Sequence, residues 1–219
     1  MWPFPLVGAE EVRTPACTII GGPNGSGKST IYDRLALPGK FVNADVIARG
    51  LNPERPEAAS LLAGKRTLAE LARVLEAWEN FVYETTLSSH QSIELMRVAG
   101  IGGYEMGLVF VALNSADLNV QRVAERVSRG GHDIPEDVIR RRYETALRRL
   151  PEAIRLADGS MVFDNSLSSG PRLLLRVQGS SIEENHLDEV DIFHCRLAEL
   201  ASDALSMPTD AVFRAARPS

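Results

Sequence analysis

The clearest chemistry in this 219-residue chain lies in a short segment of glycines and polar residues near its start. The phosphate-loop pattern G-x-x-x-x-G-K-[ST] is matched at every position by Gly22, Pro23, Asn24, Gly25, Ser26, Gly27, Lys28 and Ser29. The glycines allow the backbone N–H groups to turn toward phosphate oxygens. In such loops the lysine reaches the β- and γ-phosphates, and the serine hydroxyl ligates Mg²⁺. We therefore expect residues 22–30, Thr30 included, to bind a nucleoside triphosphate, with Ser29 on the metal.

Two carboxylates follow predicted strands. Asp45 comes just after the strand at 41–42, and Glu84 ends the strand at 81–83. In open α/β sheets ligands bind at the carboxyl ends of the strands, so both acids are expected beside the phosphate loop. Asp45 is our candidate general base, with Asn43, Glu84 and Thr86 around the group that accepts the phosphate. The alternatives are that Asp45 caps the following helix and that Glu84 is an ordinary strand-end acid.

Arginines dominate two later predicted helices, at 117–129 and 135–156. Arg122, Arg126 and Arg129 recur at i, i+4 and i+7 on the first of them, opposite an apolar face. In the second, Arg142 and Arg149 lie along one margin of the apolar side and Arg140 along the other, whereas Arg141 and Arg148 point away. A glycine hinge at 130–135 joins the helices, so the pair could close over a triphosphate as a lid. A purely solvated basic surface is the alternative.

The elements that must position these groups alternate along the chain. Short apolar strands are expected at 16–21, 41–42, 81–83, 108–113, 161–163 and 173–177, with helices between most of them. Such alternation predicts an α/β fold with a mainly parallel sheet covered on both faces, which is the three-layer sandwich of P-loop NTPases with a helical lid. We expect one domain over 1–219, with a core at 16–180, a lid at 117–150 and a tail at 182–219 that we leave unassigned.

Composition excludes several classes. A net charge of −5 disfavours a general electrostatic grip on nucleic acid or on an anionic membrane. No stretch approaches 18 apolar residues, and the start, Met1–Pro5, lacks the signs of a signal peptide. The two cysteines, Cys17 and Cys195, suggest neither a disulfide framework nor a zinc cluster. The sequence therefore predicts a cytoplasmic protein.

Taken in order, the motifs resemble the zeta toxin family, and most of all its compact bacterial branch of predicted ATPases. The resemblance spans about residues 16–170 and is carried by the segments 21–30, Asn43-Ala44-Asp45, 84–88, 129–135, Arg142-Tyr143 and Asp164-Asn165-Ser166. It implies a P-loop kinase that uses ATP and Mg²⁺. In the better-known members the acceptor is the 3′-hydroxyl of the sugar in UDP-N-acetylglucosamine. An antitoxin protein is an implied partner.

The resemblance also implies roles for individual residues. Asp45 would be the base, Glu84 and Thr86 acceptor contacts, and Arg129 with Arg142 the phosphate clamp, while Asn165 would lie near the nucleotide base. We place Arg126 on the nucleotide side as well. The chain lacks recognisable counterparts of the longer segments that hold the uridine end. Two other readings stay open: a kinase for another nucleoside, dinucleotide or nucleic-acid hydroxyl, and a nucleotide-gated binding module in which hydrolysis is a switch.

Overall fold

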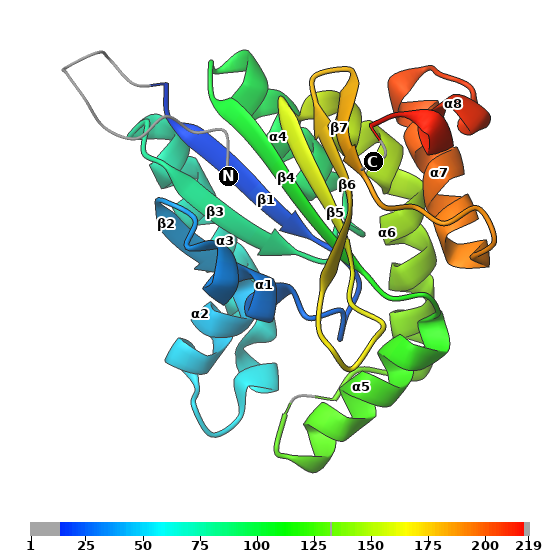
Figure 1. Cartoon of the computed structure of the whole chain (residues 1–219). Coiled ribbons are helices and arrows are strands. Elements are labelled where there is room, and N and C mark those ends of the chain that lie inside the picture. Colours follow the sequence, from blue (N-terminus) through cyan, green and yellow to red (C-terminus); the bar gives the residue numbers. More distant parts are fainter. Residues whose placement is uncertain (1–13, 132, 217–219) are drawn as a thin grey trace.

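The structure, a computed structural model, describes residues 14–131 and 133–216. The lead-in Met1–Pro5 and the hinge residue His132 of the sequence analysis lie outside the described residues. The described part is built on one seven-stranded sheet of order β2-β3-β1-β4-β5-β6-β7 (Figure 1). The strands are β1 (Ala16–Gly21), β2 (Lys40–Asn43), β3 (Phe81–Thr85), β4 (Glu105–Ala112), β5 (Gly159–Asp164), β6 (Arg172–Gln178) and β7 (Ser181–Asn185).

The sheet has a parallel part and an antiparallel edge. Strands β2, β3, β1, β4 and β5 all run parallel, which confirms the mainly parallel sheet expected from the sequence. Strands β6 and β7 pair antiparallel beside β5. The expectation that the strand at 173–177 is the last one is wrong. The segment Ser181–Asn185 carries mostly polar side chains, because β7 is an exposed edge strand with only Asn185 buried.

Helices connect the strands and cover the sheet. They are α1 (Lys28–Leu35), α2 (Ala44–Leu51), α3 (Ser60–Glu76), α4 (His90–Ile101), α5 (Ala116–Ser128), α6 (Glu136–Leu156), α7 (Ile192–Leu205) and α8 (Thr209–Arg214). The single helix expected from Pro56 to Trp78 begins instead with a 3₁₀ turn, η1 (Pro56–Ala59), before α3. None of the described helices is long and apolar enough to cross a lipid bilayer.

Side chains alternate across the strands, so the two faces of the sheet hold separate apolar clusters. On one face, Cys17, Ile19 and Phe110 pack with residues of α3, α4, α6, α7 and α8. On the other, Ile20 and Val109 pack with residues of α1. All six residues of β1 are buried, as a strand covered on both faces must be. The result is the three-layer arrangement of a P-loop NTPase.

The loops after β1, β2 and β3 all leave from the same end of the parallel strands. The phosphate loop follows β1, α2 follows β2, and the turn before α4 follows β3. The arginine-rich pair α5 and α6 reaches this end from β4, while α7 lies beside α6 and α8 lies against α7 (Figure 1). This end of the sheet is therefore where the predicted site residues can meet.

Candidate active site

The phosphate loop has a backbone that only glycine permits at two points. Gly22 has φ 146°, and a Cβ there would lie 2.1 Å from the carbonyl oxygen of Val111 on β4. Gly27 has φ 92°, and a Cβ there would lie 2.2 Å from Nδ2 of Asn165. The loop is thus pressed against the neighbouring strand and the segment after β5. Close approach, rather than flexibility, explains these glycines of the motif.

Lys28 lies at the centre of the charged groups. Its side chain is buried, and Nζ donates to the carbonyl oxygens of Gly22, at 2.9 Å, and Pro23, at 3.0 Å. Burial lowers the pKa of Lys28. The charges of Glu84 and Asp45 oppose that shift, whereas Arg126 and Arg142 add to it. The structure therefore brings two predicted carboxylates and two predicted arginines within electrostatic reach of one ammonium group.

Buried polar atoms without partners indicate that the loop is built for a ligand. Among the described residues, Ser26 Oγ in the loop and Asn119 Oδ1 on α5 are buried and make no hydrogen bond. Leaving such groups unpaired costs about 1–3 kcal/mol each, so a native protein normally satisfies them. Helix α1 begins behind the loop without a side-chain cap. The free N–H groups at this helix end fit a polyphosphate.

The side chains that fit Mg²⁺ are Ser29 and Glu84. Ser29 Oγ donates to Glu84 Oε2 at 3.1 Å, so a hydroxyl oxygen and a carboxylate oxygen lie together beside Lys28. Such hard oxygen donors suit Mg²⁺. In the part of the chain that the structure describes, no three His, Cys, Asp or Glu side chains cluster as a metal cage. An ion here would depend on the phosphates for further ligands, as Mg²⁺ commonly does.

Asp45 does not cap α2, so that interpretation from the sequence is wrong. The cap is Asn43, whose Oδ1 accepts from the backbone N–H groups of Asp45, at 2.7 Å, and Val46, at 3.1 Å. Asp45 lies in the first turn with an exposed side chain whose carboxylate accepts no hydrogen bond from any described residue. Its carboxylate is thus left available. The Asn43 oxygen, which we expected near the acceptor, is already occupied by the helix end.

The turn after β3 carries a pair of hydroxyls. The Oγ atoms of Thr86 and Ser88 lie 2.7 Å apart. Between them Leu87 adopts a left-handed backbone with φ 56°, and its side chain is fully buried in the core. Such a conformation costs about 1–3 kcal/mol, and the buried leucine offsets that cost. The anchored leucine therefore fixes the turn that holds both hydroxyls next to Glu84.

Of the two arginines expected to clamp the phosphates, Arg142 contacts the phosphate loop and Arg129 does not. Arg142 on α6 is half-buried, and its Nη1 donates to Asn24 Oδ1 at 3.1 Å. Burial and the neighbouring Arg141 lower the pKa of Arg142, and Asp45 opposes the shift. Arg129 ends α5 with an exposed side chain that makes no hydrogen bond or ion pair with any described residue. Arg126 lies one turn earlier on α5, and its charge helps to lower the pKa of Lys28.

Three arginines of α6, Arg140, Arg141 and Arg148, behave as surface groups. Arg141 and Arg148 are exposed, in line with their helical phase. Arg140 pairs with Glu136 on its own helix, at 2.7 Å, and with Asp117 on α5, at 2.6 Å. That second pair joins α5 to α6 across the hinge.

Two amides support the loop from outside. Asn165, which the sequence placed near the nucleotide, donates from Nδ2 to the carbonyl oxygen of Ser26 at 2.8 Å. Asn119 donates to the carbonyl oxygen of Asn24 and is completely buried. Sequence reasoning missed Asn119. Asn119 lies on the same apolar face of α5 as Val123, and this lone amide was the signal that could have identified it.

The fold and the phosphate loop together define a P-loop NTPase-like protein, a class of nucleotide-binding folds. More specifically, the chain belongs to the AAA domain family, whose model matches residues 18–153. A protein of Haemophilus influenzae with no characterised function is 32% identical over 126 residues, which cover 56% of this chain and 88% of that protein.

Two solved structures share the fold at low identity. One is the PezAT chromosomal toxin–antitoxin system of Streptococcus pneumoniae, with a TM-score of 0.53, 14% identity and coverage of 88% of this chain and 90% of the matched chain. The other is the complex of AvrRxo1-ORF1 and -ORF2 with ATP, with a TM-score of 0.60, 16% identity and coverage of 89% and 66%. At such identities the similarity shows the fold.

Proposed function

We propose that the protein is an ATP-dependent phosphotransferase, a zeta-toxin-like kinase that moves the γ-phosphate of ATP to a hydroxyl of a small molecule. One observation carries the proposal: Glu84 hydrogen-bonds Ser29 and Arg142 hydrogen-bonds Asn24, so a predicted carboxylate and a predicted arginine both contact the phosphate loop. A nucleotide-binding protein needs the lysine of that loop. Catalysis of γ-phosphate transfer also needs a group that receives a proton and an arginine for the charge on the transferred group.

Each residue has a role in the proposed transfer. Lys28 and the loop N–H groups hold the β- and γ-phosphates, and Ser29 and Glu84 would hold Mg²⁺, which supplies positive charge to the phosphate oxygens when bound. The acceptor oxygen forms a bond to the γ-phosphorus as the bond to the β–γ bridging oxygen breaks, and ADP leaves. The acceptor's proton passes to Asp45. Arg142, with Arg126 and Arg129 of the lid at 117–150, stabilises the transferred group.

The acceptor to test first is the 3′-hydroxyl of UDP-N-acetylglucosamine. The support is the resemblance to zeta toxins and the shared fold with the PezAT system. On the acceptor side the structure offers Asp45 and the hydroxyls of Thr86 and Ser88, groups that hydrogen-bond any sugar. Nucleosides, dinucleotides and nucleic-acid ends are therefore arms of the same experiment.

The experiment measures ADP release from ATP and Mg²⁺ with and without each acceptor. A kinase gives ADP release that depends on one acceptor, and γ-labelled ATP with a metabolite extract identifies an unknown one. ADP release that is the same with every acceptor and with the extract would contradict the proposal and leave a nucleotide-gated module.

The proposal also covers the cellular compartment, the extent of the catalytic domain and a protein partner. We place the reaction in the cytoplasm, since both cysteines are free thiols, and we treat 1–219 as one catalytic domain because β6 and β7 continue the same sheet. An antitoxin that blocks the site is a further proposal, supported by the toxin–antitoxin system among the structures of like fold. Co-purification with the product of a neighbouring gene tests it.

A further inference from the structure

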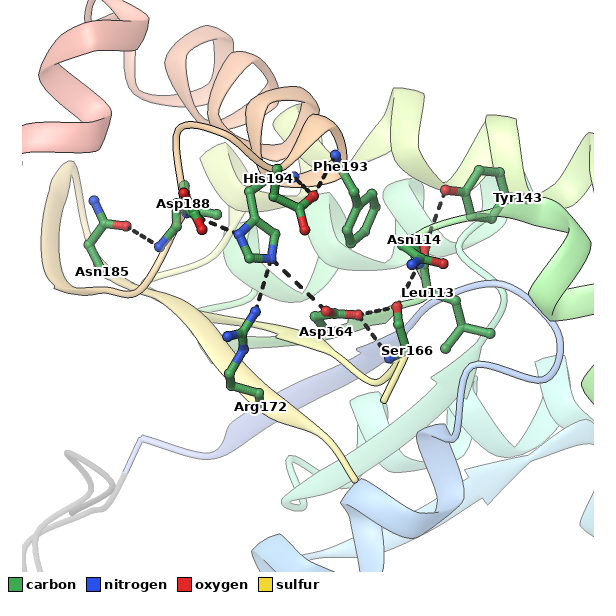
Figure 2. Close-up of polar contacts among 12 residues, drawn as sticks. Leu113, Asn114, Tyr143, Asp164, Ser166, Arg172, Asn185, Asp188, Phe193 and His194 are labelled. Carbon is green, nitrogen blue, oxygen red and sulfur yellow. Dashed lines mark hydrogen bonds and ion pairs between the residues drawn. The ribbon is translucent and has the colours of Figure 1, made fainter. Parts of the chain in front are cut away.

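A buried histidine in the tail begins a chain of polar contacts (Figure 2). His194 of α7 is 1% exposed, and its Nδ1 accepts the backbone N–H of Asp188 at 3.0 Å. Its Nε2 lies 3.2 Å from Nη2 of Arg172 and 4.0 Å from Oδ2 of Asp164. Arg172 and Asp164 therefore both lie on the Nε2 side of the imidazole ring.

Asp164 connects this histidine to the end of β5. Its Oδ2 faces His194, and Arg172 is its cross-strand partner on β6. Its Oδ1 accepts from the backbone N–H of Ser166, at 2.9 Å, and from the Ser166 hydroxyl. Ser166 Oγ in turn accepts the N–H of Asn114 at 2.8 Å. One buried carboxylate thus closes the turn of residues 164–166.

Asn165 is the middle residue of that turn, and it contacts the phosphate loop. Its backbone N–H donates to Ala112 on β4 at 2.9 Å, and its Nδ2 donates to the Ser26 carbonyl at 2.8 Å. A Cβ on Gly27 would collide with the same Nδ2. The amide therefore fixes the direction of a loop carbonyl, so that this oxygen is paired and the loop N–H groups stay free for phosphate.

We propose that His194 and Arg172 are positioning residues of the nucleotide site. His194, which Arg172 contacts, packs against the Asp164 carboxylate, and that carboxylate sets the turn that presses Asn165 onto the phosphate loop. Both residues lie beyond the segment 18–153 that the family model matches, and His194 belongs to the tail at 182–219. The inference rests on nucleotide binding by the proposed kinase and does not depend on the acceptor or on transfer.

The test is a double-mutant cycle read out as the dissociation constant for ATP with Mg²⁺, by calorimetry on the full chain. Asn165→Ala and His194→Ala should each weaken ATP binding by roughly 3- to 10-fold, the range of one hydrogen bond. The double variant should be no weaker than Asn165→Ala alone, because His194 acts through Asn165. A histidine with a purely structural role would lower the melting temperature without this coupling.

The matched control is His186→Ala, which removes an exposed histidine that pairs with Glu184 in the same tail. It should bind ATP like the wild type. If His194→Ala does not fold, Ser166→Ala takes its place in the cycle, since it removes only a half-buried hydroxyl that contacts Asp164. Wild-type affinity in the folded variant, or losses that multiply in the double variant, would overturn the proposal.

The experiments distinguish a failure of the kinase proposal from a failure of the positioning role. If the chain binds ATP but transfers nothing, the cycle can still be measured and decides the positioning role alone. If transfer occurs, the KM for ATP should rise in the His194 variant while kcat changes little, because the residue touches no reacting group. A fall in kcat at unchanged KM contradicts the assignment.

Discussion

The nucleotide side and the acceptor side of the site are built in different ways. On the nucleotide side, the loop at 22–29 is fixed from outside by Asn119, Asn165 and Arg142. On the acceptor side, Asp45 is exposed and the hydroxyl of Thr86 contacts that of Ser88 two residues along the same turn. The nucleotide side is thus held by residues from α5, α6 and the turn after β5. The acceptor side consists of residues that directly follow β2 and β3.

This difference teaches where specificity resides. A loop held by buried amides has one conformation, and it suits a ligand with an invariant polyphosphate. Exposed carboxylates and hydroxyls constrain an acceptor only weakly until the acceptor itself, or closure of the lid, completes the pocket. Substitutions on the nucleotide side should therefore remove activity toward every acceptor, whereas those on the acceptor side should separate transfer from ATP binding.

Lys28→Ala should have the largest effect. It removes the ammonium group that lies within the phosphate loop, so turnover should be undetectable and ATP binding greatly weakened, while the melting temperature changes little. Kinetics, calorimetry and thermal melting measure the three quantities. Lys65→Ala, on the exposed surface of α3, is the control and should match the wild type. Unchanged ATP affinity and activity in the Lys28 variant would refute the nucleotide site.

Arg142→Ala should lower turnover by roughly 10³-fold, the scale of an arginine that stabilises the transferred phosphoryl group. Arg129→Ala tests the other half of the clamp and should approach that loss only if the lid closes in the working complex, because Arg129 is exposed and without a described partner. Arg141→Ala and Arg148→Ala are exposed controls that should be near neutral. Equal turnover in all four variants would mean that the arginines of these helices form a solvated surface and not a phosphate clamp.

Asp45→Asn should lower phosphoryl transfer by at least about 10²-fold, because an amide cannot accept the proton. ATP binding should be normal or tighter, since one negative charge near Lys28 is removed. Folding should be intact, because Asn43 and not Asp45 caps the helix. Single-turnover transfer, ATP titration and melting test this, with Asp33→Asn on the exposed side of α1 as the control. Full transfer activity in the folded variant would leave Glu84 as the candidate base.

Thr86→Val should have the smallest effect. Losing one hydroxyl contact to the acceptor should raise the KM for the acceptor by roughly 3- to 10-fold, with the affinity for ATP unchanged. Steady-state kinetics with each substrate varied in turn separate the two constants. Thr145→Val, on α6, serves as the matched control. A change in the affinity for ATP alone would contradict the role of Thr86 in acceptor binding and would assign it to the nucleotide side.

The sequence predicted the nucleotide half because its pattern is local. The spacing of Gly22, Gly27 and Lys28 requires one backbone path, and apolar strands with helices between them require a parallel sheet. It could not predict β7 or the buried position of His194, since both depend on partners far along the chain. Asp45 was recognised as a carboxylate but given a capping alternative, because Asn and Asp cap helices about equally well and only geometry distinguishes them.

The bond between Asn165 and Ser26 joins residues that are far apart in the order of synthesis. As the ribosome releases the chain, the loop and Lys28 emerge first, but the strands on either side of β1 and the turn after β5 come much later. If His194 holds that turn as we propose, the site is completed only when α7 has emerged. A truncated product would then carry the whole motif without a finished site. Translation would thus delay the appearance of activity until α7 has been synthesised.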